Sequence, residues 1–207
     1  MKVLHIESGR HLYGGAQQVL FLLRNLPKQG VESVLLCEQR SAIAQACESE
    51  GIVTLRAAMS GDLDLRTPVH IRRACQKVRP DLIHVHSRRG VDFWAGWVAR
   101  QLGIPAVISR RVDNPEPSWL AQRKYGMYAR VITISEGIRQ VLLRQGVPET
   151  KLALVRSALE FDSYPEAIPV EVFRQRFGIR PGARVVACAA QLIDRKGHRY
   201  LLEALPA

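Results

Sequence analysis

Two apolar runs in this sequence end in the same three residues, Ser-Arg-Arg. Residues 82–86 lead into the first of these segments, 87–89, and residues 106–108 lead into the second, 109–111. If the runs are neighbouring parallel strands, both segments lie at the carboxyl edge of a sheet, where α/β proteins bind ligands. Arginine matches phosphate or carboxylate with a planar, always charged fork. The pattern predicts an anion-binding site, and the alternative is a pair of solvated basic loops. The four candidate contacts are Arg88, Arg89, Arg110 and Arg111.

The first of these runs also carries two histidines, His84 and His86. Side chains alternate across a strand, so both histidines face the same side of the sheet. Such a pair can bind a metal ion, but the sequence shows no third ligand at metal spacing and the nearby loops are cationic. We therefore expect no metal site. We expect His84 to be a hydrogen-bonded core residue and His86, at the end of the strand, to contact substrate.

A glycine-bearing loop over residues 8–15 joins the first expected strand to the first expected helix, and it ends in Gly14 and Gly15. Glycine lets backbone N–H groups approach a ligand, and the start of a helix favours negative charge. The spacing matches neither the dinucleotide-binding Gly-x-Gly-x-x-Gly nor the phosphate loop that ends in Gly-Lys-Ser/Thr. The loop is a candidate ligand contact, with a plain tight turn as the alternative.

Two carboxylates stand two residues apart at Asp62 and Asp64. Such a pair can hold a divalent metal ion, but it is also common in loops, where Asp64 can cap the segment that follows. We favour the structural interpretation because no apolar strand ends in this motif.

A basic turn over residues 194–197 follows an expected strand and opens a helix near the end of the sequence. The position of Lys196, beside Gly197 and a helix amino terminus, suits a diphosphate group. A basic turn exposed to solvent has the same sequence, so this segment alone leaves both interpretations open.

The composition is that of a globular protein with a basic excess. Of the 207 residues, 47% are hydrophobic, and Lys and Arg outnumber Asp and Glu by 30 to 19, a net charge of +11. This excess attracts nucleic acid, anionic membrane surfaces or acidic small molecules without choosing among them. The four cysteines are far apart and indicate buried thiols in a reducing compartment. The amino terminus does not resemble a signal peptide, and no apolar run approaches the ~20 residues of a membrane helix. We expect a cytoplasmic protein, with at most peripheral contact at the inner face of a membrane.

Strand and helix signals alternate through the first 155 residues, which is typical of a parallel sheet covered on both faces. The sequence therefore predicts an α/β fold with a Rossmann-like parallel sheet and helices on both sides. The expected strands are residues 2–6, 33–37, 52–55, 82–86, 106–109, 131–134 and 152–155.

The pattern changes after residue 155. Residues 156–169 indicate a linker, followed by a short helix, a buried strand over 184–189 and a helix over 198–205. One strand and its helices cannot bury both faces of a sheet, so we expect the truncated start of a second Rossmann-like domain. The expected domains are residues 1–165 and residues 166–207, the latter holding a linker and a first β-α unit.

Taken together, these segments resemble the retaining glycosyltransferases of family four, which have the GT-B fold. The family's Gly-Gly-Ala loop is matched by residues 14–16, and its Asp-Ile-(Ile/Val)-His-x-His strand by residues 81–86. A Val-Ile-x-x-Ser-Glu segment is matched by residues 131–136, and Gly-Val-Pro-x-x-Lys by residues 146–151. The opening of the family's second domain, Gly-Arg-Leu-x-x-x-Lys-Gly, is matched in part by residues 190–197. The resemblance covers essentially the whole chain.

The resemblance implies a two-domain enzyme that transfers a sugar from a nucleotide-diphosphate sugar, such as a UDP- or GDP-sugar, with no cofactor and no metal. The amino-terminal half would bind the acceptor, and basic groups would offset the charge of the leaving diphosphate. His86 would be the catalytic residue that faces the transferred sugar or the acceptor. Gly14 and Gly15 would contact the acceptor. Gly15, Gln191 and Lys196 would lie at the donor diphosphate.

Two departures from the family pattern affect these expectations. Gln191 replaces the family's diphosphate arginine, which removes a charge from that contact. The family's Glu-x7-Glu region, which holds the donor, would follow Ala207. We therefore expect an acceptor half of a larger transferase that has little or no activity alone.

The Ser-Arg-Arg segments suggest an anionic acceptor, a phosphorylated or carboxylated saccharide or a lipid-linked one, with lipopolysaccharide core as the leading hypothesis. Two other classes of function compete with this one. A nucleic-acid-binding protein is motivated by charge alone, because the basic residues are scattered and no recognised motif is present. A non-catalytic acceptor-binding or scaffold module has no feature in the sequence that separates it from a transferase half.

Overall fold

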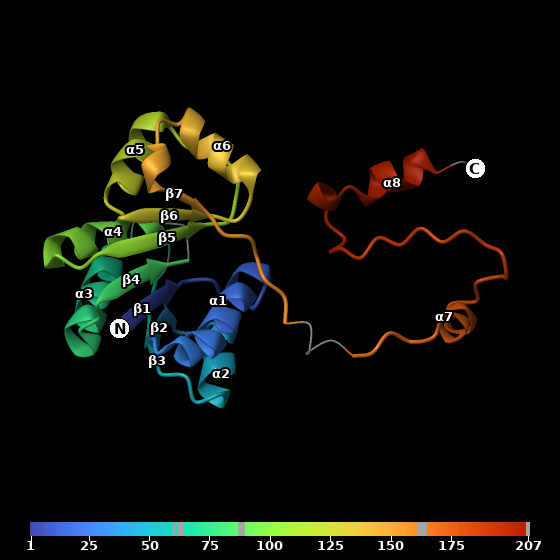
Figure 1. The fold of residues 1–207 in the computed structure, drawn as a ribbon, viewed down its shortest axis with the longest axis horizontal. Helices are drawn as coiled ribbons and strands as arrows, with labels where there is room; N and C mark the ends of the chain where they lie inside the picture. Colours follow the sequence, from blue (N-terminus) through green and yellow to red (C-terminus); the bar gives the residue numbers. More distant parts are fainter. Residues whose placement is uncertain (60, 62–63, 87–89, 161–164, 206–207) are drawn as a thin grey trace. The chain divides into compact units, whose positions relative to one another are not determined.

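All seven strands expected in the first 155 residues pair into one parallel sheet in the computed structural model of the chain (Figure 1). Their order across the sheet is β3-β2-β1-β4-β5-β6-β7. The chain therefore builds outward from β1 in one direction and from β4 in the other, and this reversal leaves a crevice at the carboxyl ends of the two central strands. The strands are β1 (Lys2–Glu7), β2 (Glu32–Glu38), β3 (Thr54–Ala57), β4 (Leu82–Val85), β5 (Ala106–Arg110), β6 (Arg130–Thr133) and β7 (Leu152–Leu154).

Helices cover both faces of this sheet, as the alternation of strands and helices predicted (Figure 1). Two helices, α1 (Gly14–Asn25) and α2 (Ala42–Ser49), pack on one face in a cluster that includes Leu35 and Cys37. The remaining helices of the sheet unit pack against the other face in a larger cluster that includes Leu4 and Ile6. They are α3 (Arg66–Val78), α4 (Val91–Leu102), α5 (Ser118–Gly126) and α6 (Glu136–Arg144).

Short-range signals position several helix ends. Ser135 caps α6, since its Oγ accepts a hydrogen bond from the N–H of Ile138 at 3.3 Å. Gly103 ends α4 with a φ of 67°, a conformation that favours glycine. Ser41, which directly precedes α2, does not cap the helix with its side chain, because its hydroxyl donates to the carbonyl of Glu38 at 2.8 Å.

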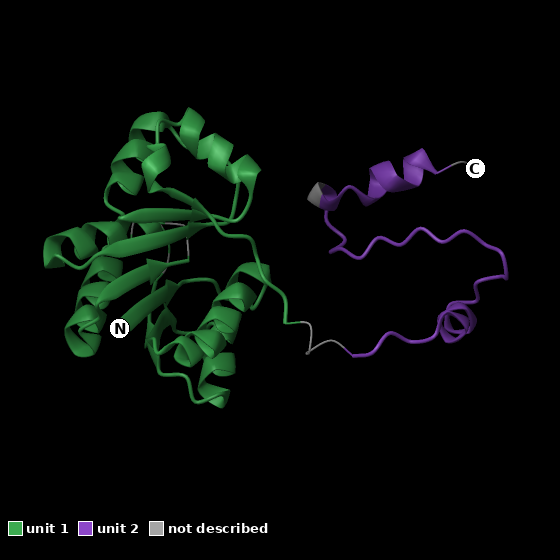
Figure 2. Cartoon of the chain, viewed as in Figure 1, with its two compact units in different colours: residues 1–160 green, residues 161–207 purple. Residues whose placement is uncertain are grey.

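The chain divides into two compact units, residues 1–160 and residues 161–207 (Figure 2). The structure describes residues 1–59, 61, 64–86, 90–160 and 165–205. The sequence predicted a division after residue 165, and the assignment of the two units to domains of a larger fold stays a prediction.

The second unit contains the two helices expected from the sequence, α7 (Val170–Arg176) and α8 (His198–Ala204), with a 3-10 turn η4 (Asp194–Lys196) between them. The expected strand over residues 184–189 is wrong: this segment belongs to no strand and is exposed. A strand is stable when its backbone N–H and C=O groups pair with a neighbour. The described residues of this unit offer no other strand to pair with.

Lys151 connects the last part of the first unit to the end of α5. Its ammonium group donates to the carbonyls of Gly126 and Tyr128, each at 2.8 Å, and lies 3.5 Å from the carbonyl of Tyr125. Carbonyls at a helix carboxyl end have no partner within the helix, and a cation stabilises them. The lysine of the segment 146–151 therefore has a structural role.

Replacing Lys151 with methionine is expected to lower the free energy of unfolding by about 1–2 kcal/mol, because charge-assisted hydrogen bonds to these carbonyls are lost. Urea unfolding measures the change. Lys77, exposed near the end of α3, provides the control, since Lys77→Met is expected to stay within about 0.5 kcal/mol of the original chain. Equal effects of the two substitutions would contradict the capping role.

Candidate functional site

A pocket of about 770 Å³ opens at the carboxyl ends of the central strands. Its walls come from the end of β1, the loop that leads into α1, the end of β4 and the end of β5. This is the crevice where the strand order reverses, the place at which open α/β sheets bind ligands. The lining residues from these elements include Glu7, Gly15, His86, Ser109 and Arg111.

The backbone conformation at the start of α1 does not require glycine at either of its first two positions. Neither Gly14 nor Gly15 has a positive φ. A Cβ added at Gly14 would meet nothing within 4 Å, and one at Gly15 would lie 3.6 Å from Cδ of Arg111, an ordinary contact. Gly15 lines the pocket, whereas Gly14 is not among the lining residues. The absence of a side chain at Gly15 therefore keeps the backbone of the helix start open toward the pocket and toward Arg111.

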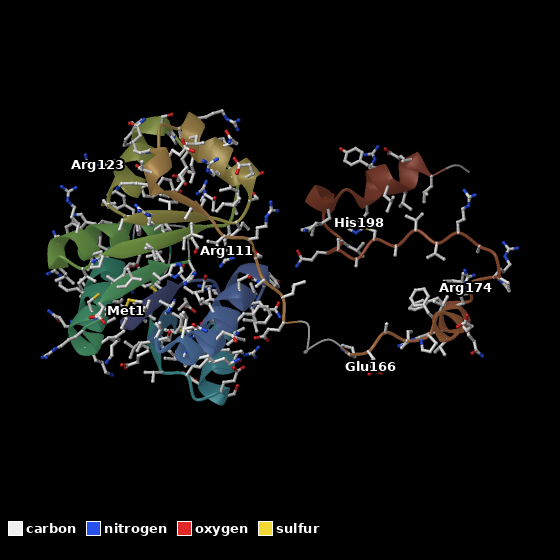
Figure 3. The ribbon with its side chains drawn as sticks, in the orientation of Figure 1. Met1, Arg111, Arg123, Glu166, Arg174 and His198 are labelled. Carbon is white, nitrogen blue, oxygen red and sulfur yellow. The ribbon has the colours of Figure 1, made fainter. Side chains whose placement is uncertain are left out.

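Of the predicted arginines that the structure describes, Arg111 is the one that lines this pocket, and Arg10 of the loop before α1 lines it as well. The side chain of Arg111 lies near α1 at the strand ends (Figure 3). Burial lowers the pKa of its guanidinium, and the carboxylate of Glu7 acts in the opposite direction. Among the residues that the structure describes, the buried Nε of Arg111 has no hydrogen-bond partner, and no carboxylate forms an ion pair with its guanidinium. A half-buried cation with unused donors is suited to bind an anion.

Arg110, by contrast, points away from the pocket, which corrects the expectation that it contacts the acceptor. Neighbouring side chains of a strand face opposite sides, so Arg110 and Arg111 cannot share one site. Arg110 is 2% exposed and donates to the carboxylate of Glu116 at 2.8 Å and to the carbonyl of Asn114. Glu116 in turn lies 2.6 Å from the ammonium of Lys124. Arg110 therefore belongs to a buried structural network.

The structure describes only some of the other residues that the sequence predicted as ligand contacts. Arg88 and Arg89 lie outside the described residues, and their role as acceptor contacts stays a prediction. Gln191 and Lys196 are exposed in the second unit, and their role at a diphosphate also stays a prediction. Asp64 accepts a hydrogen bond from the N–H of Arg66, the first residue of α3, at 3.1 Å, which agrees with the structural interpretation of that carboxylate.

Three histidines meet on the pocket side of the sheet, one more than the sequence indicated. His5 of β1 is the register partner of His84 of β4, and His86 follows two residues later. Nδ1 of His5 lies 3.1 Å from Nε2 of His86, and Nε2 of His84 lies 2.9 Å from Oγ of Ser109. The interpretation of His84 as a hydrogen-bonded core residue agrees with this contact. His5 was missed because it stands alone in its segment, and only strand pairing brings it beside the other two.

Burial sets the charge of these histidines. It lowers the pKa of His5 to about 4 and the pKa of His84 to about 3, with His5 and Arg111 adding to the effect on His84. Burial also holds the pKa of His86 well below its usual value, with smaller contributions from the two other histidines and Arg111. All three rings are therefore neutral near pH 7. Each neutral ring has one N–H group that can donate a hydrogen bond and one nitrogen whose lone pair can accept one.

A second cavity, of about 390 Å³, lies on the other side of His86, Ser109 and Arg111. These three side chains line both cavities. The remaining walls of the second cavity are largely apolar and include Phe21 and Ile132. A ligand in the pocket and the contents of the second cavity would therefore meet at the same three side chains.

No helix among the described residues is long and apolar enough to cross a lipid bilayer.

A family model described as a glycosyl transferase 4-like domain matches residues 13–158 of the chain. The match begins in the loop before Gly14 and includes the histidine strand and both Ser-Arg-Arg segments. No curated protein matches the chain.

Several solved structures share the fold. A glycosyltransferase from Rickettsia africae superposes with a TM-score of 0.72 at 14% identity, covering 87% of this chain and 50% of that one. HepE from Anabaena, solved with UDP and glucose, has a TM-score of 0.64 at 14% identity, covering 86% of this chain and 50% of that one. MurG from Acinetobacter baumannii has a TM-score of 0.51 at 16% identity, covering 64% and 40%. At these identities the likeness shows the fold, and the chain spans half the length of the first two structures.

Proposed function

This chain belongs to the family of glycosyl transferase 4-like domains, and on that premise we propose that it is the acceptor-binding part of a glycosyltransferase. The transferase moves a sugar from a nucleotide-diphosphate sugar to an anionic acceptor, with retention at the transferred carbon. Its fold supports this role, because the Rossmann-like sheet has its pocket at the crevice where such folds bind substrates.

The observation that carries the proposal is the state of Arg111 in the pocket. Its guanidinium is partly buried, has a free donor and pairs with no carboxylate among the described residues. Gly15 leaves the helix start open beside it, and His86 lines the same pocket. Buried arginines usually pair with a carboxylate of the protein. On Arg111, a phosphate or carboxylate of the acceptor would fill that role. His86 would then face the acceptor hydroxyl or the transferred sugar.

The donor is proposed from the similar structures. HepE was solved with UDP-glucose as well as with UDP and glucose, which supports a UDP-sugar for this protein. Gly15 would lie at the diphosphate on the acceptor side. Lys196 and Gln191 would contact the diphosphate from the second unit.

The acceptor is proposed to be a phosphorylated saccharide of the cell envelope, with lipopolysaccharide core as the specific candidate and a lipid-linked saccharide as the variant. The net charge of +11 supports work beside an anionic membrane surface, because such a surface attracts basic proteins. The enzyme would then act at the cytoplasmic face of the membrane.

The proposal is tested by calorimetric titration of the chain with phosphorylated core oligosaccharide, with the dephosphorylated oligosaccharide and with UDP. Arg111→Ala is expected to weaken binding of the phosphorylated oligosaccharide by about 30-fold or more, because a partly buried charge contact is lost. Arg111→Lys keeps the positive charge but lacks the planar, two-pronged guanidinium. Its affinity for the phosphorylated oligosaccharide is expected to lie between those of the original chain and Arg111→Ala.

Arg123 on the outside of α5 is the matched control, since Arg123→Ala removes the same charge far from the pocket (Figure 3). Gly15→Ala adds one methyl group that fits the free protein, so a loss of binding there reports contact with the ligand. Equal affinity for the phosphorylated and dephosphorylated oligosaccharides, or equal losses for Arg111→Ala and Arg123→Ala, would contradict an anionic acceptor on Arg111.

A further inference from the structure

Three neighbouring helices of the first unit, α3, α4 and α5, share one feature: their exposed charged side chains are all basic. The helices follow one another along one face of the sheet (Figure 1). Their only carboxylate side chain is that of Asp92, which is buried and pairs with Lys124. Acidic residues are favoured in the first turn of a helix, yet the first turns of α3 and α5 have none. The outer surface of these helices therefore attracts anions.

Large apolar side chains are exposed on the same three helices. Leu65, which directly precedes α3, is 71% exposed, and Val69 in the first turn of α3 is 46% exposed. Trp97 of α4 is 38% exposed, and Trp119, the second residue of α5, is 69% exposed. A single exposed apolar residue is common, but tryptophan is mostly buried in folded proteins. Two exposed tryptophans together with two aliphatic side chains indicate an interaction surface.

Two arginines stand beside these apolar residues. Arg73 is four residues after Val69 on α3, and Arg100 is three residues after Trp97 on α4. Residues three or four apart are neighbours on the surface of a helix. Both arginines are exposed, and the side chain of neither forms a hydrogen bond or an ion pair with another described residue. Their charges are therefore available to a partner of the protein.

A hydrogen bond between side chains aligns α3 with α4. Arg72 of α3 donates to the side-chain oxygen of Gln101 of α4. Val69 and Trp97 each stand one helical turn before these two residues, so they lie on adjoining turns of the two helices. The apolar residues of α3 and α4 therefore belong to one surface.

This surface lies close to the pocket. The loops that lead into α3 and α5 form part of the pocket wall, through Met59 and Val112. Leu65 and Trp119 stand where these loops enter their helices. The apolar part of the surface is therefore at the same edge of the sheet as the pocket, whereas Arg73 and Arg100 lie further along the helices.

We propose that the exposed face of α3, α4 and α5 docks the first unit on an anionic lipid bilayer. Tryptophan is enriched at the boundary between lipid and water, where its ring is half buried. Leucine and valine gain by entering the acyl region, and arginines interact with anionic headgroups. A nucleic acid would attract the arginines, but it offers no apolar surface to the aliphatic residues. The residues that form this docking surface are Leu65, Val69, Arg73, Trp97, Arg100 and Trp119.

The inference deepens the proposed function, which places the acceptor at a membrane. Docking by this surface brings the pocket edge of the sheet to the headgroups, so it favours a lipid-linked acceptor over a free oligosaccharide. The two proposals fail separately. Vesicles that contain no acceptor measure the docking surface, and titration with soluble oligosaccharide measures the contact with Arg111.

The test mixes the full chain with vesicles of phosphatidylglycerol and phosphatidylcholine, and compares them with vesicles of phosphatidylcholine alone. At about 0.1 M salt the chain is expected to sediment with the anionic vesicles only. Its tryptophan emission is expected to shift to the blue, because Trp97 and Trp119 leave water. The double variant Arg73→Glu, Arg100→Glu is expected to weaken binding by about 30-fold or more. The double variant Trp97→Ala, Trp119→Ala is expected to weaken it by about 10-fold or more, because apolar burial is lost.

The matched control is the double variant Lys28→Glu, Arg40→Glu, which changes the net charge by the same amount. Both residues are exposed; Lys28 follows α1 and Arg40 precedes α2, the helices that cover the other face of the sheet. This variant is expected to bind within about threefold of the original chain, since salt screens distant charges. Circular dichroism shows whether each variant is folded.

Four results would overturn the proposal. They are equal binding to the two kinds of vesicle, equal losses for the two variants with glutamate substitutions, and unchanged binding of the tryptophan variant. The fourth is a double-stranded oligonucleotide that binds more tightly than the anionic vesicles and depends on Arg73 and Arg100, which would identify a nucleic acid as the partner.

Discussion

Replacing Glu116 with alanine is expected to destabilise the first unit by about 3–5 kcal/mol, the usual cost of removing one partner from a buried ion pair. Glu116 lies 2.8 Å from a guanidinium nitrogen of Arg110 and 2.6 Å from the ammonium of Lys124. Lys124 also pairs with Asp92 at 2.8 Å. Without Glu116, the side chain of Arg110 keeps its charge in a site that is almost closed to water.

Urea unfolding followed by tryptophan fluorescence measures this effect, because Trp94, Trp97 and Trp119 all belong to the first unit. The matched control is the exposed pair of Lys2 and Glu32, which are 2.9 Å apart. Glu32→Ala is expected to cost no more than about 1 kcal/mol, as exposed ion pairs do. A Glu116→Ala effect as small as that of the control would show that Arg110 is not held by this network.

The same network predicts a dependence on pH. Burial alone would raise the pKa of Glu116, but its contacts with Lys124 and Arg110 lower it below the ordinary value of 4.5. A carboxyl group whose pKa is lower in the folded state stabilises the protein above the unfolded-state pKa, and this contribution is lost as the pH falls through the folded-state pKa. The difference in stability between the original chain and Glu116→Ala is therefore expected to be constant near neutral pH and to shrink below pH 4.5.

Replacing Tyr128 with alanine is expected to cost about 3–5 kcal/mol, the usual effect of deleting a buried aromatic ring. Tyr128 is 1% exposed, and its hydroxyl donates to the carbonyl of Asp92. Its ring packs against Gly96 of α4, where an added Cβ would lie 2.9 Å from Cε2 of the ring. Tyr128→Phe keeps the ring and is expected to cost about 1 kcal/mol for the lost hydrogen bond.

A substitution at Gly96 separates ring packing from other effects. In a helix, Gly→Ala normally stabilises by about 1 kcal/mol. Here Gly96→Ala is expected to destabilise the original chain, because the overpacking cost of about 1–3 kcal/mol exceeds that gain. In the Tyr128→Ala background the same substitution is expected to stabilise by about 1 kcal/mol, since the obstructing ring is gone. The same sign in both backgrounds, measured by urea unfolding, would mean that the ring of Tyr128 does not set the space at Gly96.

Local signals predicted most of the elements of the first unit. The apolar runs that became β1 and β4 are buried strands because both faces of the sheet are covered, and this pattern appears directly in the sequence. Ser135 and Gly103 act on backbone groups within a few residues of themselves, so their roles at helix ends are visible without a fold. The strand expected over residues 184–189 failed because a strand depends on a partner that the local sequence does not contain.

The candidate site shows where local reasoning ends. The repeat of Ser-Arg-Arg correctly pointed to the carboxyl edge of the sheet, and Arg111 lines the pocket there. Arg110, one residue earlier, is buried against Glu116 on the other face. Because side chains alternate along a strand, the sequence alone could place the two arginines on opposite faces of the sheet. Which of the two faces the pocket depends on which elements pack on each face.

The sequence by itself determined the α/β architecture, the order of its elements and the place of the ligand crevice, because periodicity, caps and strand ends act over short distances along the chain. Only the tertiary structure decided which side chains share the crevice. Parallel pairing of β1 with β4 sets His5 beside His84 and His86, and the packing around Glu116 removes Arg110 from the site. These are contacts between residues far apart in the sequence. They depend on the register between paired strands and on the face of the sheet to which each side chain points, and a local sequence pattern predicts neither.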